Sequence, residues 1–153
     1  ALATPVSSPT TASTILIFMK KAILLFTLLL GMATPAVFAQ RQGMLTIYTR
    51  FTGIIEGYDL NTKTVIYMDG NLVGETTEQL QSEPNSCSVN LRRGKHTLRI
   101  VNMARCNGKW EEHTYKNNYS IDALYETKIK LKKRMTINLL FDISKEKTFA
   151  TLK

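Results

Sequence analysis

The chain has 153 residues, with 20 lysines and arginines against 12 acidic residues, so its formal net charge is +8. Such a balance favours anionic partners such as lipid headgroups, acidic glycans or nucleic acid, although it also aids solubility. The two histidines and two cysteines lack the neighbours, at characteristic spacing, that a hydrolase triad, a metal site or a redox pair requires. The composition therefore argues against an enzyme, and no cofactor or metal is expected.

An export signal occupies residues 19–39. Two lysines form a positive n-region, the apolar stretch Ala22–Leu30 follows, and small residues precede a cleavage site after Ala39. The apolar run is about half of the roughly 20 residues that a membrane-spanning helix needs, which favours cleavage over a retained transmembrane anchor. We expect residues 1–18 to be upstream sequence outside the fold. Residues 40–153 should form a single domain in the periplasm or outside the cell.

The first half of this domain has the alternation and the turn residues of β-strands. Apolar and polar side chains alternate over residues 44–51, and residues 63–68 are mostly β-branched or aromatic. Asp69-Gly70 then predicts a tight hairpin turn before a short strand over residues 71–74. Residues 75–86 are polar and contain a proline, which predicts the longest loop of the domain.

The second half continues the pattern to the end of the chain. Two strands with a glycine-containing turn between them span residues 88–101, and another strand spans 109–115. The alternation is clearest over residues 125–132, where apolar side chains face one way and charged ones the other, and it resumes over 137–143. A short strand over 149–152 completes the series. Seven or eight strands without a helical stripe predict an all-β fold, a small antiparallel β-sandwich of the immunoglobulin-like type.

Three turn motifs carry a resemblance to a known family. They are VIYMDG at Val65–Gly70, LVGET at Leu72–Thr76 and LRRGKHTLRI at Leu91–Ile100. Through them, residues 64–100 resemble the PEGA-type module, a small β-sandwich unit of exported bacterial proteins. The resemblance implies a PEGA-like sandwich and an export context, and it brings no catalytic or ligand-binding residue with it.

Three glycines lie at the predicted turns of the same segment. Gly70, Gly74 and Gly94 each follow or begin a strand, and we expect all three at positive φ, a conformation that a Cβ disfavours.

The two cysteines, Cys87 and Cys106, both lie in the exported domain. In an oxidising compartment, two thiols about twenty residues apart predict a disulfide bond. A loop of that size would stabilise the fold by roughly 3 kcal/mol.

Basic residues form two groups on predicted strands and turns. Without residues 1–39, the 18 basic and 12 acidic residues that remain leave a net charge of +6. If the two groups were neighbours, they could bind a polyanion; otherwise they form a solvated face that discourages edge-to-edge aggregation. Nucleic acid is not expected, because no aromatic residues interleave with the lysines. The candidate anion-binding residues are Arg92, Arg93, Lys95, Arg99, Lys128, Lys130, Lys132, Lys133 and Arg134.

Aromatic residues gather between Gly108 and Glu126. Trp110, Tyr115 and Tyr119 lie near several amides and carboxylates, so they are candidates for contacts with a glycan. The alternative is that they fill the core while their polar tips reach water.

These features predict an exported, non-enzymatic binding or structural domain of the bacterial cell envelope, with an anionic glycan or another envelope component as the expected partner. The alternative is an inhibitor or immunity-type protein that blocks an extracytoplasmic enzyme. In that role, the loop over residues 75–86 or the basic tip at 132–134 would act as a wedge.

Overall fold

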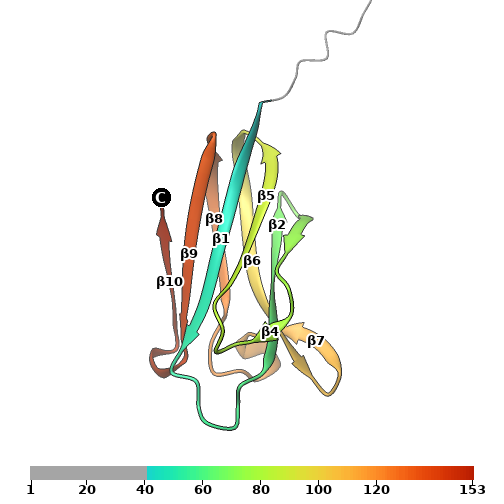
Figure 1. Cartoon of the computed structure of the whole chain (residues 1–153), viewed down its shortest axis with the longest axis vertical. Coiled ribbons are helices and arrows are strands. Elements are labelled where there is room, and N and C mark those ends of the chain that lie inside the picture. The colour runs from blue at the N-terminus through green and yellow to red at the C-terminus, as the bar shows by residue number, and fades with distance from the viewer. Residues whose placement is uncertain (1–40) are drawn as a thin grey trace, which may run out of the picture. The chain divides into compact units, whose positions relative to one another are not determined.

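A computed structural model describes residues 41–153, which fold into two β-sheets packed as a sandwich (Figure 1). These residues lie within one compact unit. The predicted upstream segment (1–18) and signal peptide (19–39) lie outside the described residues. The strands are β1 (Gln42–Thr52), β2 (Asn61–Met68), β3 (Asn71–Glu75), β4 (Gln79–Leu80), β5 (Asn85–Arg92), β6 (Gly94–Cys106), β7 (Lys109–Glu112), β8 (Leu124–Leu131), β9 (Arg134–Asp142) and β10 (Lys147–Leu152).

The first sheet has the strand order β10-β9-β1-β5. Its central strand, β1, pairs antiparallel with β5, where Leu45 lies opposite Val89, and parallel with β9, where Ile47 lies opposite Ile137. The parallel pair departs from the wholly antiparallel arrangement that we predicted. It arises because β1 and β9 are connected through the whole second sheet, so no hairpin turn dictates their relative direction.

The second sheet has the order β3-β2-β6-β7, with β4 also paired to β2 and β8 paired to β6. Its organising strand is β6, which has 13 residues. Because β6 is so long, Gly94–Val101 pair with β8 and Met103–Cys106 pair with β7. The short pieces β3 and β4 share the opposite edge of β2.

The core lies between the two sheets and consists of the inward row of each strand. Alternation along the strands places these side chains on one face of each sheet, and each large one stabilises the fold by roughly 1.5–3 kcal/mol on burial. The largest fully buried side chains of this core are Leu45, Ile47, Ile66, Leu98, Ile100, Ile121, Leu131, Ile137, Leu139 and Phe141.

The predicted all-β sandwich is confirmed, with ten strands in place of seven or eight. The additional strands are short: β4 and the start of β5 fall within residues 75–86, where we predicted a loop. Two 3-10 turns, η1 (Tyr115–Asn117) and η2 (Ile143–Lys145), supply the only helical geometry of the described part. None of the helical segments in residues 41–153 has the length and apolar character of a membrane span.

Two of the three predicted positive-φ glycines are confirmed. Gly70 has φ 80° and Gly94 has φ 141°, as the turns before β3 and β6 require. Gly74 does not follow the prediction, because it lies inside β3, outside the left-handed region. A Cβ at Gly74 would come 2.5 Å from Val89 Cγ1 and 3.3 Å from Cys87 Sγ, so this glycine serves the close approach of β3 to β5.

The predicted disulfide is wrong, because both cysteines are free. Cys87 lies against Gly74, which is opposite Ile66, and Ile66 in turn is opposite Ile100 of β6. Cys106 lies six residues further along β6, about 20 Å away at ~3.3 Å per residue. A disulfide needs Cα atoms within about 7 Å of each other. The spacing of the two cysteines along the chain suggested a disulfide bond, but the strands place the two thiols at different heights of the sandwich, too far apart to form one.

Candidate anion-binding site

Two turns that are distant in sequence meet at one end of the sandwich, uppermost in Figure 1. The register of β5 places Arg92 opposite Gln42, at the start of β1, and the register of β9 places Arg134 opposite Met44. The β5–β6 and β8–β9 turns therefore flank the first residues of β1. This convergence unites the two basic groups that the sequence keeps apart.

A glycine at the start of β1 permits this close arrangement. A Cβ at Gly43 would overlap the carbonyl oxygen of Lys132 and would lie 3.3 Å from Arg93 Cγ. On the other side, Arg93 Nε donates a hydrogen bond of 2.7 Å to the carbonyl oxygen of Gln42. Backbone hydrogen bonds of 3.0 Å, from the Arg93 N–H to the Arg41 carbonyl oxygen and from the Met44 N–H to the Lys133 carbonyl oxygen, also fasten both turns to β1. The other charged side chains of the two turns face solvent.

We call the resulting surface the basic end. All its members except Arg93 are exposed, and none of them takes part in an ion pair with the carboxylates of residues 41–153. They make up half of the 18 basic residues of this part of the chain. The basic end consists of Arg41, Arg92, Arg93, Lys95, Lys128, Lys130, Lys132, Lys133 and Arg134.

The pairing of β6 with β8 joins the turns to a row of lysines. Lys95 lies opposite Lys130, and Thr97 lies opposite Lys128. All four residues are exposed, because the strand alternation that buries Ile129 directs them away from the core. Like charges directly opposite each other repel, so an anion placed between the two strands would relieve this repulsion.

A hollow of about 380 Å³ lies among these lysines. It is lined by Lys95, Thr97, Lys128 and Lys130, together with the pair formed by Asp69 and His96. Ammonium groups and a hydroxyl around a shallow recess are the donors that a carboxylate, sulfate or phosphate group needs.

The one carboxylate that lines the hollow, Asp69, already has hydrogen-bond partners within the protein. Asp69 Oδ2 lies 2.7 Å from His96 Nδ1, and Asp69 Oδ1 accepts from the backbone N–H of Thr97 at 2.8 Å. His96 Nε2 lies 2.8 Å from the carbonyl oxygen of Arg92. The hydrogen bond from His96, followed by that from Thr97, holds the pKa of Asp69 below its ordinary value.

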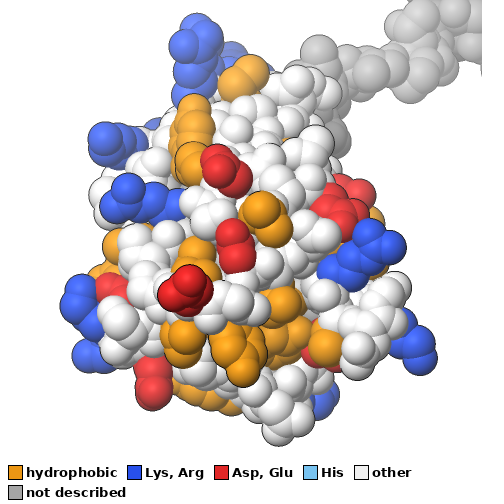
Figure 2. Space-filling view, turned by 60° about the horizontal axis from the view of Figure 1, so that its bottom comes forward, with side chains coloured by type: hydrophobic (Ala, Val, Ile, Leu, Met, Phe, Trp, Pro, Cys, Tyr) orange, Lys and Arg blue, Asp and Glu red, His pale blue; other side chains and the backbone are white. Residues whose placement is uncertain are grey.

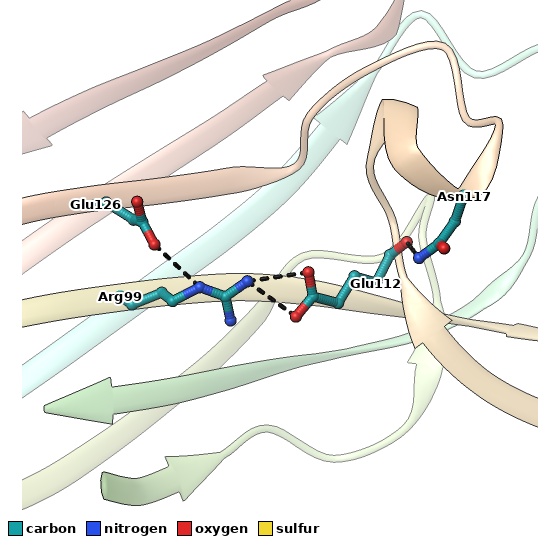
Figure 3. Close-up of polar contacts among 4 residues, drawn as sticks. All are labelled: Arg99, Glu112, Asn117 and Glu126. Atoms are coloured by element: carbon teal, nitrogen blue, oxygen red, sulfur yellow. Dashed lines mark hydrogen bonds and ion pairs between the residues drawn. The ribbon is translucent and has the colours of Figure 1, made fainter. Parts of the chain in front are cut away.

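Arg99 does not belong to the basic end, although the sequence grouped it there. Its Nη2 donates to both carboxylate oxygens of Glu112, at 2.8 and 2.9 Å, and its Nε donates to Glu126 Oε1 at 3.0 Å (Figure 3). Asn117 holds the backbone of Glu112 in place through a hydrogen bond of 2.7 Å to its carbonyl oxygen. Two carboxylates therefore occupy Arg99, which leaves it as a structural link between β6, β7 and β8.

The three candidate glycan-contact aromatics do not form one platform. Trp110 lies below two cations, with Lys63 Nζ 5.1 Å and Arg105 Cζ 6.0 Å from its ring. Tyr119 donates a hydrogen bond of 2.8 Å to Glu111 Oε1, and Tyr115 is exposed on η1. Trp110 and Glu111 are neighbours on β7 and point to opposite faces of the sheet, so Tyr119, which bonds to Glu111, lies on the other side from Trp110.

The segment over residues 75–86 packs against the domain. Thr76 and Gln81 are buried, with 5% and 3% of their surface exposed. The Gln81 amide donates to the carbonyl oxygen of Tyr58 at 2.8 Å, and the Ser82 hydroxyl donates to Asp59 Oδ2 at 2.6 Å. These bonds tie the segment to the β1–β2 loop, so it lacks the free projecting shape of a wedge.

Sequence reasoning missed one member of the basic end, Arg41, because it lies alone beside the expected cleavage site. Its position next to the β5–β6 turn depends on the pairing of β1 with β5, where the Arg93 N–H donates to the Arg41 carbonyl oxygen at 3.0 Å. Within residues 41–153, no three His, Cys, Asp or Glu side chains gather closely enough to hold a metal ion.

No protein-family model and no curated protein matches the chain. Among solved structures, it is similar to a non-hemolytic pneumolysin from Streptococcus pneumoniae, at 14% sequence identity and a TM-score of 0.37, covering 74% of this chain and 24% of that one. A Bacteroides ovatus protein described as a candidate for cell adhesion is similar at 12% identity and a TM-score of 0.35, covering 74% of this chain and 44% of that one. The chain spans less than half the length of each. Likenesses this remote carry no argument about function.

Proposed function

We propose that the protein is exported and acts as a non-enzymatic binding domain, which holds an anionic glycan of the bacterial cell envelope at its basic end. The observation that carries this proposal is the convergence of nine basic side chains, none of them in an ion pair within residues 41–153, on one end of the sandwich. The signal-like segment at residues 19–39 and the PEGA-type turn motifs support the export context.

The distribution of charge supports binding in one orientation. Outside the basic end, residues 41–153 contain nine basic and 11 acidic residues besides Asp69, which itself lines the hollow. The domain is therefore strongly positive at one end, and weakly negative over the rest of its surface. A field of this kind steers an anionic chain toward the positive end and raises its association rate.

The chemistry of the basic end favours a glycan over a nucleic acid. A single-stranded nucleic acid is held by aromatic side chains on which its bases stack, and no tryptophan, tyrosine or phenylalanine lines the lysine hollow. Scattered ammonium groups and the Thr97 hydroxyl suit the dispersed carboxylate or sulfate groups of an acidic polysaccharide.

A pair of charge-matched variants tests the proposal. The first is Lys132→Gln with Lys133→Gln and Arg134→Gln, which neutralises one tip of the basic end. The second neutralises three exposed lysines elsewhere, at positions 109, 116 and 147, and lowers the net charge equally. Binding of dextran sulfate is measured between 50 and 300 mM NaCl, with uncharged dextran as the control ligand.

We expect the first variant to lose at least tenfold in affinity at low salt, and the second to lose less than threefold. The slope of log K against log salt should flatten by roughly two units in the first variant, because three fewer cations displace counterions. Equal losses in the two variants would show that only net charge matters and would reject the basic end as the site. Binding that does not change with salt would do the same.

A further inference from the structure

A second recess lies away from the basic end, and nothing in the function proposed above uses it. It has a volume of about 440 Å³ and is walled by the β1–β2 loop, the residue after β4, the end of β6, residues 113–120 and η2. Two of its lining residues, Ile55 and Tyr58, are exposed hydrophobic side chains. Figure 2 shows hydrophobic side chains gathered at this end of the domain, with acidic side chains beside them. We call it the His113 pocket.

Two buried polar side chains in its wall each have one atom without a hydrogen-bond partner. Gln81 and His113 line the pocket and are each only 3% exposed. Gln81 Oε1 and His113 Nδ1 have no partner in the protein, and a buried polar atom without one normally costs the fold free energy on the order of 1–3 kcal/mol. Buried polar atoms without a partner are therefore candidates for hydrogen bonds with a ligand that enters the pocket.

Neither side chain is free to turn toward another partner. Gln81 is held to the β1–β2 loop twice, since its amide donates to the Tyr58 carbonyl oxygen at 2.8 Å and its backbone N–H donates to the Leu60 carbonyl oxygen at 2.9 Å. The His113 ring lies between Phe51, at 5.3 Å between ring centroids, and Tyr119, at 4.2 Å. The two side chains that carry the unpartnered atoms are thus held in place in the wall.

The wall also determines which chemistry it can accept. An amide oxygen only accepts, so a ligand that satisfies Gln81 must carry a donor. Burial lowers the pKa of His113 to about 4, so at neutral pH its ring presents one N–H and one lone pair, and a hydroxyl group can pair with either. No lysine or arginine lines the pocket, which leaves an anion without a counter-charge, whereas Leu60 and Ile143 give it apolar walls.

We propose that the His113 pocket binds a small, uncharged aromatic alcohol. The ring lies against the apolar walls, and the hydroxyl group forms hydrogen bonds with the polar atoms that the protein leaves without partners. A pocket of this volume is within the ordinary range for small-molecule sites. The site is separate from the basic end in place and in chemistry.

Two probes that differ by one hydroxyl group test this assignment. p-Cresol carries the hydroxyl and toluene does not, while the apolar ring and methyl group are common to both. Cys106 lines the pocket and Cys87 does not, so the rate of alkylation of each thiol by N-ethylmaleimide, followed by mass spectrometry, reports occupancy with an internal control. We expect p-cresol to protect Cys106 saturably, to leave Cys87 unaffected, and to bind at least tenfold more tightly than toluene.

Matched variants assign the hydrogen bond. Gln81→Met keeps the length of the side chain and removes its acceptor, so the preference for p-cresol over toluene should fall to within about threefold. Gln79→Met is the control, since Gln79 also donates its amide to a loop carbonyl, that of Pro84 at 2.7 Å, but lies outside the pocket. His113→Phe gives an independent test if the first variant does not fold.

Several results would overturn the proposal. They are the absence of saturable p-cresol binding to the wild-type protein, equal affinity for toluene and p-cresol, and tighter binding of methyl glucoside, which would make the ligand a sugar. The glutamine substitutions at positions 132–134 should leave p-cresol binding unchanged, so failure of the basic end and failure of this pocket can be told apart.

Discussion

His113 should make the stability of the domain depend on pH between about 4 and 6.5. The ring is 3% exposed and stacked between two aromatic side chains. Burial lowers its pKa from the ordinary value of 6.5 to about 4, because the charged form of the ring would lose its hydration without gaining a partner.

The sign and size of the effect follow from this shift. Between pH 6.5 and 4 the unfolded chain binds a proton that the folded chain excludes, so the free energy of unfolding is highest above pH 6.5 and falls as the pH is lowered. The loss amounts to about 2 kcal/mol at pH 5 and approaches about 3 kcal/mol below pH 4. The lowered pKa values of Asp69 and Asp142 act below this window, since both start from 3.8.

Urea denaturation at pH 7.5 and at pH 5 measures the effect, with His113→Phe as the test variant. Phenylalanine can keep the aromatic contacts and cannot titrate, so most of the difference of about 2 kcal/mol should disappear. His96→Gln is the control. His96 lies outside the His113 pocket, so this variant should lose as much stability at acidic pH as the wild-type protein does. If His113→Phe has the same dependence on pH as the wild-type protein, the reasoning about the buried ring is wrong.

Three further predictions concern the fold. Gly74→Ala should destabilise the domain by about 1–3 kcal/mol through overlap with Val89, and adding Val89→Ala should restore part of this loss; strictly additive losses in urea denaturation would contradict the close approach of β3 and β5. Alkylation of the unreduced, denatured protein should modify both Cys87 and Cys106. An unmodified protein whose mass is two hydrogens below that of the reduced chain would show that the disulfide bond does form. Arg99→Met should cost about 0.5–1 kcal/mol at low salt, and the loss should shrink in 1 M NaCl; a loss that salt does not change would assign the effect to packing.

The inward and outward rows of the strands could be predicted from sequence because alternation is a local property. Over residues 125–132, the predicted apolar row became the inward side of β8, on which Ile129 and Leu131 are buried. The Asp69-Gly70 turn was equally predictable, since two residues at positive φ satisfy a two-residue hairpin whatever surrounds it.

The candidate site was predictable only in part. The basic residues were visible in the sequence, but the sequence did not show whether their two groups are neighbours. The structure makes them neighbours by pairing β6 with β8, where Lys95 lies opposite Lys130. Sequence could not show that Arg99 is occupied by Glu112, because the two lie on different strands and the contact depends on the β6–β7 register. Nor could the sequence show that Trp110 and Tyr119, which are close along the chain, have different partners: Trp110 lies against Lys63 and Arg105, and Tyr119 bonds to Glu111.

By itself, the sequence determined that this protein is an all-β sandwich, where most of its strands run, and which side chains face inward, because backbone sterics and burial act over a few neighbouring residues. Only the tertiary structure decided that β1 runs parallel to β9, that the two cysteines lie apart, and that nine basic side chains converge on one end. Those outcomes depend on which strands become neighbours and in which register. The register is set by the packing of the whole core, to which every strand contributes at once.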